Sequence, residues 1–181
     1  MEADEQPLRS LAEELLQPSL IGEIRRQYRL RWLGIHGASH WARVLRNGLD
    51  LVPGTGADPK VVILFSVFHD ACRIDDLWDP PHGARGAKLA SRLRGSLFEL
   101  EEEKMSLLHK ACRDHTRVKH HKDVTIQTCW DADRLDLSRI GAVVDLEYLG
   151  PWASGSPDQI EISSLRAREK QYPMRELFEA E

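Results

Sequence analysis

Apolar residues recur along most of this chain three or four residues apart, and strict alternation of apolar and polar residues is scarce. The first spacing places side chains on one face of an α-helix, whereas alternation is typical of a half-buried strand. The segment 40–52 shows the helical spacing most clearly, at Trp41, Val44, Leu45, Leu49 and Val52. The pattern therefore predicts an all-α fold.

The expected helices cover most of the chain. Pro18 separates two short helices at 8–17 and 19–33, and Ser19 can cap the second. Further helices are expected at 40–52, 60–73, 83–95, about 98–115 and roughly 125–137. The β-branched start of 60–73 is also compatible with a buried strand, but its apolar character persists beyond the usual strand length, which favours a helix.

The length of 181 residues suits one compact domain. After Pro151 the composition shifts toward charged residues. We expect residues 151–181 to form a charged helical tail that packs on the same domain or makes a homodimer contact.

Charge and composition exclude several classes of protein. The 29 acidic and 25 basic side chains give a net charge of -4, so no overall positive field would attract nucleic acid or an anionic membrane. The longest apolar block, VVILF, is far shorter than the roughly 20 residues of a membrane span. The three cysteines lack metal or redox spacing, and no secretory signal is evident. We expect a cytoplasmic protein with no membrane attachment and no dedicated nucleic-acid binding.

Histidines and aspartates lie beside or within the predicted helices. His69 and Asp70 end the most apolar segment, where an ionisable pair is costly to bury unless its charge is compensated. A divalent transition metal ion, bound by imidazole nitrogens and carboxylate oxygens, supplies that compensation. The candidate ligands are His40, His69, Asp70 and Asp131. Four ligands would leave positions for water and a substrate oxygen, as hydrolysis requires.

The strings HWARV, VFHD and DADRLD carry these four residues. In order and separation they resemble the HD superfamily of metal-dependent phosphohydrolases, over residues 36–150. The resemblance implies an HD-domain helical bundle at 36–150, preceded by N-terminal helices in 1–35. It also implies the same four ligands, and we expect manganese, iron, nickel, cobalt or zinc as the metal.

Members of this family with two metal ions use further histidines, and the aspartate of the His-Asp pair bridges both ions. In this chain His82, His109 and His115 stand in the corresponding stretch. Each is a candidate for a second metal ion or for a substrate contact. Asp133 is expected to orient a ligand rather than to be one.

Two arginines are candidates for the substrate phosphate. Arg43 matches the HxxRV pattern, and the resemblance implies that it contacts the phosphate or braces the site. Arg73 stands where one branch of the family, the 5′-deoxynucleotidases, has a carboxylate, so that substrate does not carry over. Asp136 is expected to pair locally at a helix end, and His36 is assigned no role.

The sequence therefore predicts a metal-dependent phosphohydrolase that cleaves a phosphate ester in a nucleotide or a related small metabolite. Asp70 would be both ligand and proton acceptor, and Arg43 and Arg73 would balance charge on the phosphate. Two alternatives stay open: a di-iron oxygenase on the same scaffold, and a non-catalytic module that binds nucleotide or metal.

Overall fold

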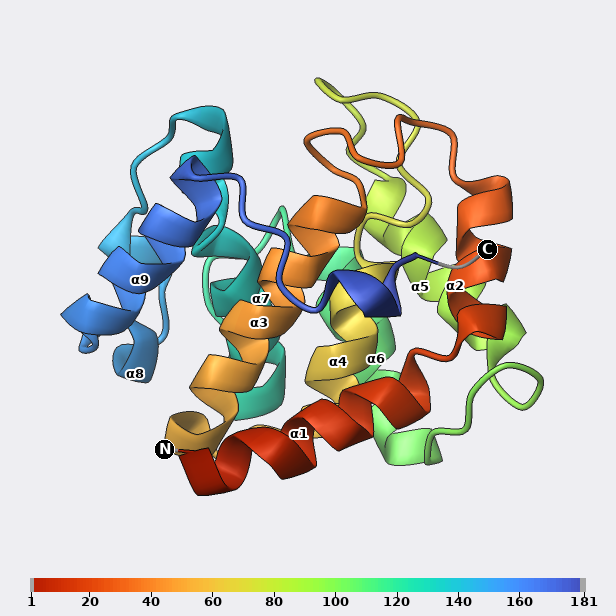
Figure 1. Ribbon diagram of the computed structural model, residues 1–181, viewed down its shortest axis with the longest axis horizontal. Coiled ribbons are helices and arrows are strands. Elements are labelled where there is room, and N and C mark those ends of the chain that lie inside the picture. The colour runs from red at the N-terminus through yellow and green to blue at the C-terminus, as the bar shows by residue number, and fades with distance from the viewer. Residues whose placement is uncertain (1, 180–181) are drawn as a thin grey trace.

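The computed structural model describes residues 2–179, with side chains from Gln6 onward. Within this range the chain is helical and has no β-strand, which confirms the predicted all-α fold (Figure 1). The α-helices are α1 (Glu2–Leu15), α2 (Pro18–Gln27), α3 (Ala38–Thr55), α4 (Pro59–Phe68), α5 (His82–Leu93), α6 (Glu102–Asp114), α7 (Val124–Arg134), α8 (Pro151–Ser154) and α9 (Pro157–Arg168). Short 3-10 turns are η1 (Leu137–Ile140), η2 (Leu146–Tyr148) and η3 (Arg175–Leu177).

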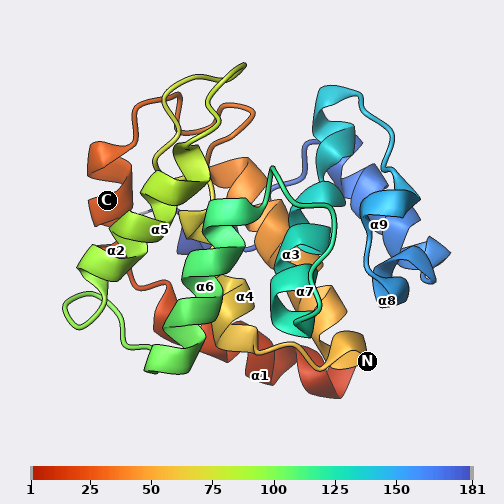
Figure 2. The same ribbon diagram turned by 180° about the vertical axis from the view of Figure 1, so that it is seen from behind.

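Helix α4 is the centre of the fold, and α1, α3, α5, α6 and α7 pack around it (Figures 1 and 2). All residues from Val61 to Phe68 are buried, so the helix is apolar on every side. Its start is fixed by Pro59 in the first turn and by the Asp58 carboxylate, which accepts hydrogen bonds from the backbone N–H groups of Lys60 and Val61. The Pro59 and Asp58 contacts start a helix here, although the β-branched residues that follow were also compatible with a strand.

The second helix ends earlier than its apolar pattern predicts. Residues 28–37 form a loop, and the N-cap of α2 is Gln17 rather than Ser19, because Pro18 already lies in the first turn. The loop folds tightly before α3. A Cβ atom at Gly37 would lie 2.0 Å from the carbonyl oxygen of Trp32, so only glycine fits there.

The segment after residue 150 returns to the body of the protein. Helix α9 packs on α3, where the buried Arg166 guanidinium donates to the Asn47 side-chain oxygen at 2.6 Å and to the Asp50 carboxylate at 3.0 Å. The chain then crosses the face seen in Figure 1 toward α2, and Phe178 is fully buried.

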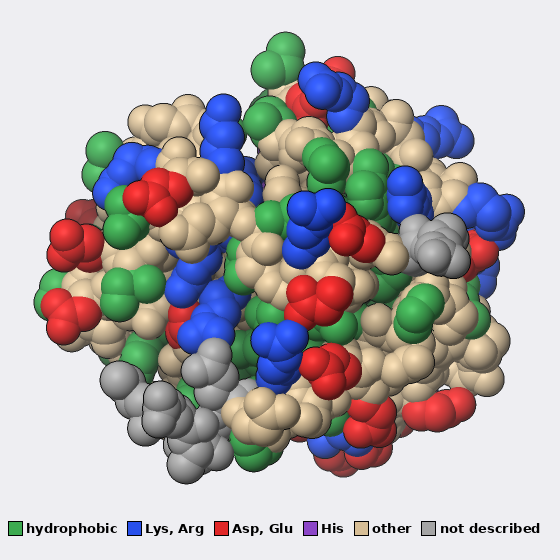
Figure 3. All heavy atoms as spheres, viewed as in Figure 1, with side chains coloured by type: hydrophobic (Ala, Val, Ile, Leu, Met, Phe, Trp, Pro, Cys, Tyr) green, Lys and Arg blue, Asp and Glu red, His purple; other side chains and the backbone are tan. Residues whose placement is uncertain are grey.

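Several helix ends meet at one side of the bundle. The N-terminal ends of α3 and α5 and the C-terminal ends of α4 and α6 point toward the side that carries the loops 28–37 and 69–81, and the C-terminal end of α7 lies beside them (Figure 2). The face in Figure 3 carries interspersed acidic and basic side chains, and no histidine is seen on it. Among the described residues, no helix is long and apolar enough to cross a membrane.

Candidate metal centre

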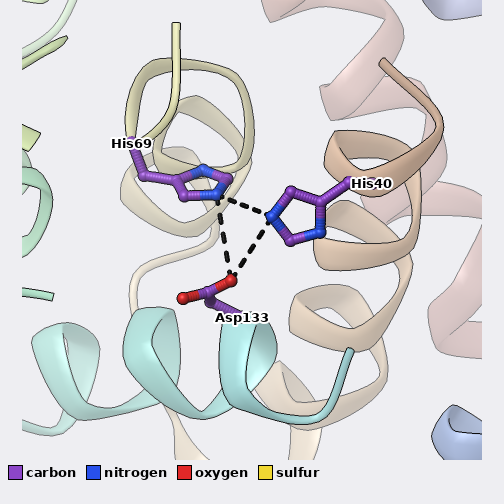
Figure 4. A group of neighbouring side chains, drawn as sticks. All are labelled: His40, His69 and Asp133. Carbon is purple, nitrogen blue, oxygen red and sulfur yellow. Dashed lines mark hydrogen bonds and ion pairs between the residues drawn. The ribbon is translucent and has the colours of Figure 1, made fainter. Parts of the chain in front are cut away.

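Three buried or nearly buried side chains converge from α3, the end of α4 and α7 (Figure 4). His40 lies in the first turn of α3, His69 caps the C-terminus of α4, and Asp133 lies in the last turn of α7. The two Nε2 atoms of the histidines are 3.1 Å apart. Asp133 Oδ1 lies 3.4 Å from His40 Nε2 and 3.9 Å from His69 Nε2.

A second buried group lies beside the first. His82 begins α5 and His115 caps the C-terminus of α6, and their Nε2 atoms are 3.0 Å apart. Asp70, which directly follows His69, completes this group. Its Oδ1 atom lies 3.2 Å from His82 Nε2 and 3.9 Å from His115 Nε2.

The Asp70 carboxylate connects the two groups. Its Oδ2 atom lies 3.7 Å from the Nε2 atoms of both His40 and His69, while its Oδ1 atom faces His82 and His115. One carboxylate therefore presents one oxygen to each histidine pair.

The other nitrogen of each histidine has an acceptor. The Nδ1 atom of His69 donates to Ser66 O at 3.0 Å, that of His115 to Cys112 O at 2.7 Å, and that of His82 to the Asp79 carbonyl oxygen. A carbonyl oxygen can only accept, so Nδ1 carries the proton in all three rings and the Nε2 lone pair faces the partner ring. Lone pairs about 3 Å apart repel one another, unless a cation lies between them.

The charge state of the cluster follows from its burial. Burial lowers the pKa of His69 to about 3 and also lowers the pKa of His82, so these imidazoles are neutral at pH 7. Burial alone would raise the pKa of Asp70 and Asp133, but the neighbouring histidines hold both below the usual aspartate value. Neutral imidazoles and ionised carboxylates are the forms that bind metal ions. These buried groups could therefore hold a metal ion.

Asp131, the aspartate predicted as a ligand, does not face the histidines. It accepts from Gln127 Nε2 at 2.8 Å and from the Gly150 N–H at 3.0 Å. Two residues along a helix correspond to a rotation of about 200° about its axis, so Asp131 and Asp133 point to nearly opposite sides of α7. Asp133, to which the sequence assigned a supporting role, is the aspartate that lies against His40 and His69.

Arg43 braces the cluster and does not reach into it. Its guanidinium Nε donates to Asp136 Oδ1 at 2.7 Å, and Nη1 donates to the Gln171 carbonyl oxygen at 3.0 Å. The other oxygen of Asp136 accepts from His40 Nδ1 at 2.7 Å, which fixes the tautomer of that ring. Asp136 was expected to pair only locally. The signal in the sequence is its spacing, since it follows Asp133 by three residues and so shares the helical face of that residue.

The remaining candidates lie at different distances from the cluster. Arg73 is adjacent to it, with Nη1 3.5 Å from Asp70 Oδ1 and 3.3 Å from His82 Nε2. His109 is half-buried on α6 and belongs to neither group. His36, to which no role was assigned, is buried and contacts Asp76 Oδ1 through Nδ1 at 2.8 Å, which links the loops 28–37 and 69–81.

A pocket of about 470 Å³ opens beside the second group, and both Arg73 and His82 line it. Its size is that of an ordinary small-molecule site. No family model, curated protein or solved structure matches this chain. The cluster and this pocket are therefore the features of the chain that point to a function.

Proposed function

We propose that the protein is a metal-dependent phosphohydrolase with two divalent transition metal ions bound side by side in this cluster. His40, His69 and Asp133 would hold one ion, and His82 and His115 the other. Asp70, whose two oxygens face different histidine pairs, would contribute to holding both ions.

The observation that carries the proposal is the pairing of the histidine nitrogens around Asp70. Two Nε2 pairs are 3.1 Å and 3.0 Å apart, and the Asp70 oxygens are divided between them. A buried set of this kind is unfavourable without cations, because lone pairs and carboxylates then face each other in a medium of low dielectric constant. Metal ions remove that cost.

The charge balance favours an anionic substrate. Two carboxylates, Asp70 and Asp133, would offset half of the charge of two divalent ions, and the four histidines are neutral ligands. The third carboxylate, Asp136, is already paired with Arg43. A net positive centre remains, and Arg73 at its edge adds a guanidinium whose planar fork matches a phosphate group.

Divalent ions at such a site polarise phosphate oxygens and lower the pKa of bound water toward neutral pH. The residues of the chain then have separate tasks. Asp136 and the backbone carbonyl groups hold the ring orientations, Asp70 keeps the two histidine pairs in register, and Arg73 would bind the phosphate where the pocket meets the cluster. The substrate would be a phosphate ester small enough to enter that pocket.

The proposal is tested by phosphate release after reconstitution with manganese, iron(II), nickel, cobalt or zinc. The substrates are nucleoside mono-, di- and triphosphates and sugar phosphates. Asp133→Asn and Asp131→Asn form a matched pair, since both make the same substitution on one helix. We expect turnover by the wild type and by Asp131→Asn, and its loss in Asp133→Asn and Asp70→Asn.

Two results would contradict the proposal. One is an absence of turnover with every metal although the protein binds metal, which would favour a non-catalytic module. The other is activity only with iron and with consumption of oxygen, which would favour the oxygenase alternative. Turnover with zinc, which has no redox chemistry, separates the hydrolase from that alternative.

A further inference from the structure

The loop 71–81 carries the most exposed large apolar side chains beside the cluster. Leu77 is 88% exposed and Trp78 is 81% exposed, and both line the pocket that Arg73 and His82 also line. A single exposed apolar residue needs no explanation, but adjacent Leu and Trp side chains at the mouth of a pocket are typical of a binding surface.

The backbone of this loop is held in place. The Asp75 carboxylate accepts from Leu77 N at 2.6 Å and from Trp78 N at 3.3 Å. Asp79 Oδ2 accepts from Ile74 N at 2.8 Å, and Asp76 contacts His36 in the neighbouring loop. These hydrogen bonds restrain the backbone that presents Trp78, and such restraint reduces the entropy cost of binding.

The polar side of the pocket is basic. Arg117 lies at its wall and donates to the Pro80 carbonyl oxygen at 3.2 Å. Among the described residues it has no carboxylate partner. The one carboxylate in the wall, Asp79, is paired with Arg85, so it does not offset the charge of Arg117. The pocket thus joins a cationic side to an apolar, aromatic side.

We infer that Trp78, with Leu77 beside it, is the specificity subsite of the enzyme and stacks on a planar aromatic group in the alcohol portion of the phosphate ester. Arg73 and Arg117 would bind the phosphate portion. The inference rests on the proposed function and narrows its substrates to phosphate esters that carry a planar ring. Stacking on an indole face needs a flat partner and tolerates different rings, so the subsite selects a class of substrate rather than one base.

Kinetics supply the first test. Adenosine 5′-monophosphate and ribose 5-phosphate carry the same phosphate ester on ribose, and adenosine 5′-monophosphate has an adenine base where ribose 5-phosphate has a hydroxyl. For Trp78→Ala we expect KM to rise about tenfold for the nucleotide, while kcat for both and KM for ribose 5-phosphate change by less than about twofold. Trp152→Ala is the control, because Trp152 is also a partly exposed tryptophan but lies on α8 and does not line the pocket. Equal effects of Trp78→Ala on both substrates would refute the subsite.

A binding measurement separates the subsite from the reaction. The five tryptophans are labelled with fluorine, and the Trp78 signal is identified by its loss in Trp78→Phe. Phosphonate analogues of the two compounds, which cannot be hydrolysed, are then added to the metal-loaded protein. We expect the Trp78 signal to shift with the analogue that carries the adenine base and not with the analogue of ribose 5-phosphate.

The two measurements fail in different ways. A shift of the Trp78 signal without any phosphate release would refute the proposed hydrolysis and leave the subsite standing. Phosphate release with no shift from the ring-bearing analogue would refute the subsite and leave the hydrolase standing.

Discussion

Asp136 offers the sharpest test of how the protein orients its histidines. This carboxylate is fully buried and accepts from His40 Nδ1 and Arg43 Nε, both at 2.7 Å. Asp136→Asn keeps the shape but leaves one oxygen for two donors. The new amide N–H would favour a proton on His40 Nε2, which is the nitrogen that faces the cluster.

The magnitude follows from these contacts. Hydrogen bonds to charged groups contribute about 1.5–3 kcal/mol each, and an unpaired buried charge costs about 3–5 kcal/mol. Since the asparagine oxygen can still serve Arg43, we expect a loss of about 3 kcal/mol in stability. For a chain of this length that lowers Tm by about 6–12 °C. Loss of the group that orients a ligand also weakens metal binding by about 10–100-fold.

The assay pairs thermal unfolding with metal titration against a chromophoric chelator. Asp133→Asn is the comparison, because it should weaken metal binding while the Asp136 carboxylate keeps its hydrogen bonds to both His40 and Arg43, so its metal-free Tm should fall less. The reasoning would be refuted if Asp136→Asn kept the metal affinity of the wild type, or if its metal-free Tm were unchanged.

Three further predictions follow from other residues. Burial raises the pKa of Asp131 to about 6, so the folded protein holds this proton more tightly than the unfolded chain does, and stability should fall as pH rises from about 4 to about 6. In urea unfolding, Asp131→Asn should lack this loss of up to about 3 kcal/mol, and a pH profile identical to that of the wild type would contradict the prediction. Gly86→Ala should destabilise the protein, because a Cβ there would lie 2.0 Å from Phe68 O and α5 would have to move. Since His82 begins α5, the same shift should weaken metal binding by His82 and His115, and an unchanged urea midpoint would contradict the prediction. Removal of bound metal by a chelator should lower Tm by about 5–11 °C relative to protein in metal at 100 times its Kd, and a Tm that does not depend on metal would count against the site.

The central helices, and the place of His69 and Asp70 in the site, could be predicted from the sequence. Apolar spacing predicted α3, and the length of the apolar run predicted the buried helix α4. The position of His69 and Asp70 at the end of that helix indicated a charge that needs compensation. These features are local, because each depends on side chains within a few turns of one another.

Asp133 rather than Asp131 lies against His40 and His69, and the reason is local. The matching string contains both residues, and only the direction of each side chain on α7 decides which faces the cluster. The spacing of Asp133 and Asp136 places them on one face, and Gln127, four residues before Asp131, lies on the other. Helical geometry separates the two aspartates, but only the packing of α7 against α3 and α4 shows which of them faces the cluster.

Other features could not be read from spacing at all. The pairing of His82 with His115 depends on the close packing of α5 against α6, where a Cβ at Gly83 would lie 2.1 Å from Cys112 O. The bond from Arg43 to Gln171 joins residues far apart in the chain. The exposed position of Trp78 depends on an irregular loop, in which no periodic pattern distinguishes a buried residue from an exposed one.

Metal content per chain tests the central claim most directly. The protein is stripped of metal, reconstituted with manganese or zinc, freed of unbound ions by gel filtration and analysed by mass spectrometry. We predict two ions per chain in the wild type and in Asp131→Asn, one in His115→Ala, and almost none in Asp70→Asn. A wild type with fewer than two ions, or an Asp70→Asn variant that keeps both, would contradict the two-metal centre.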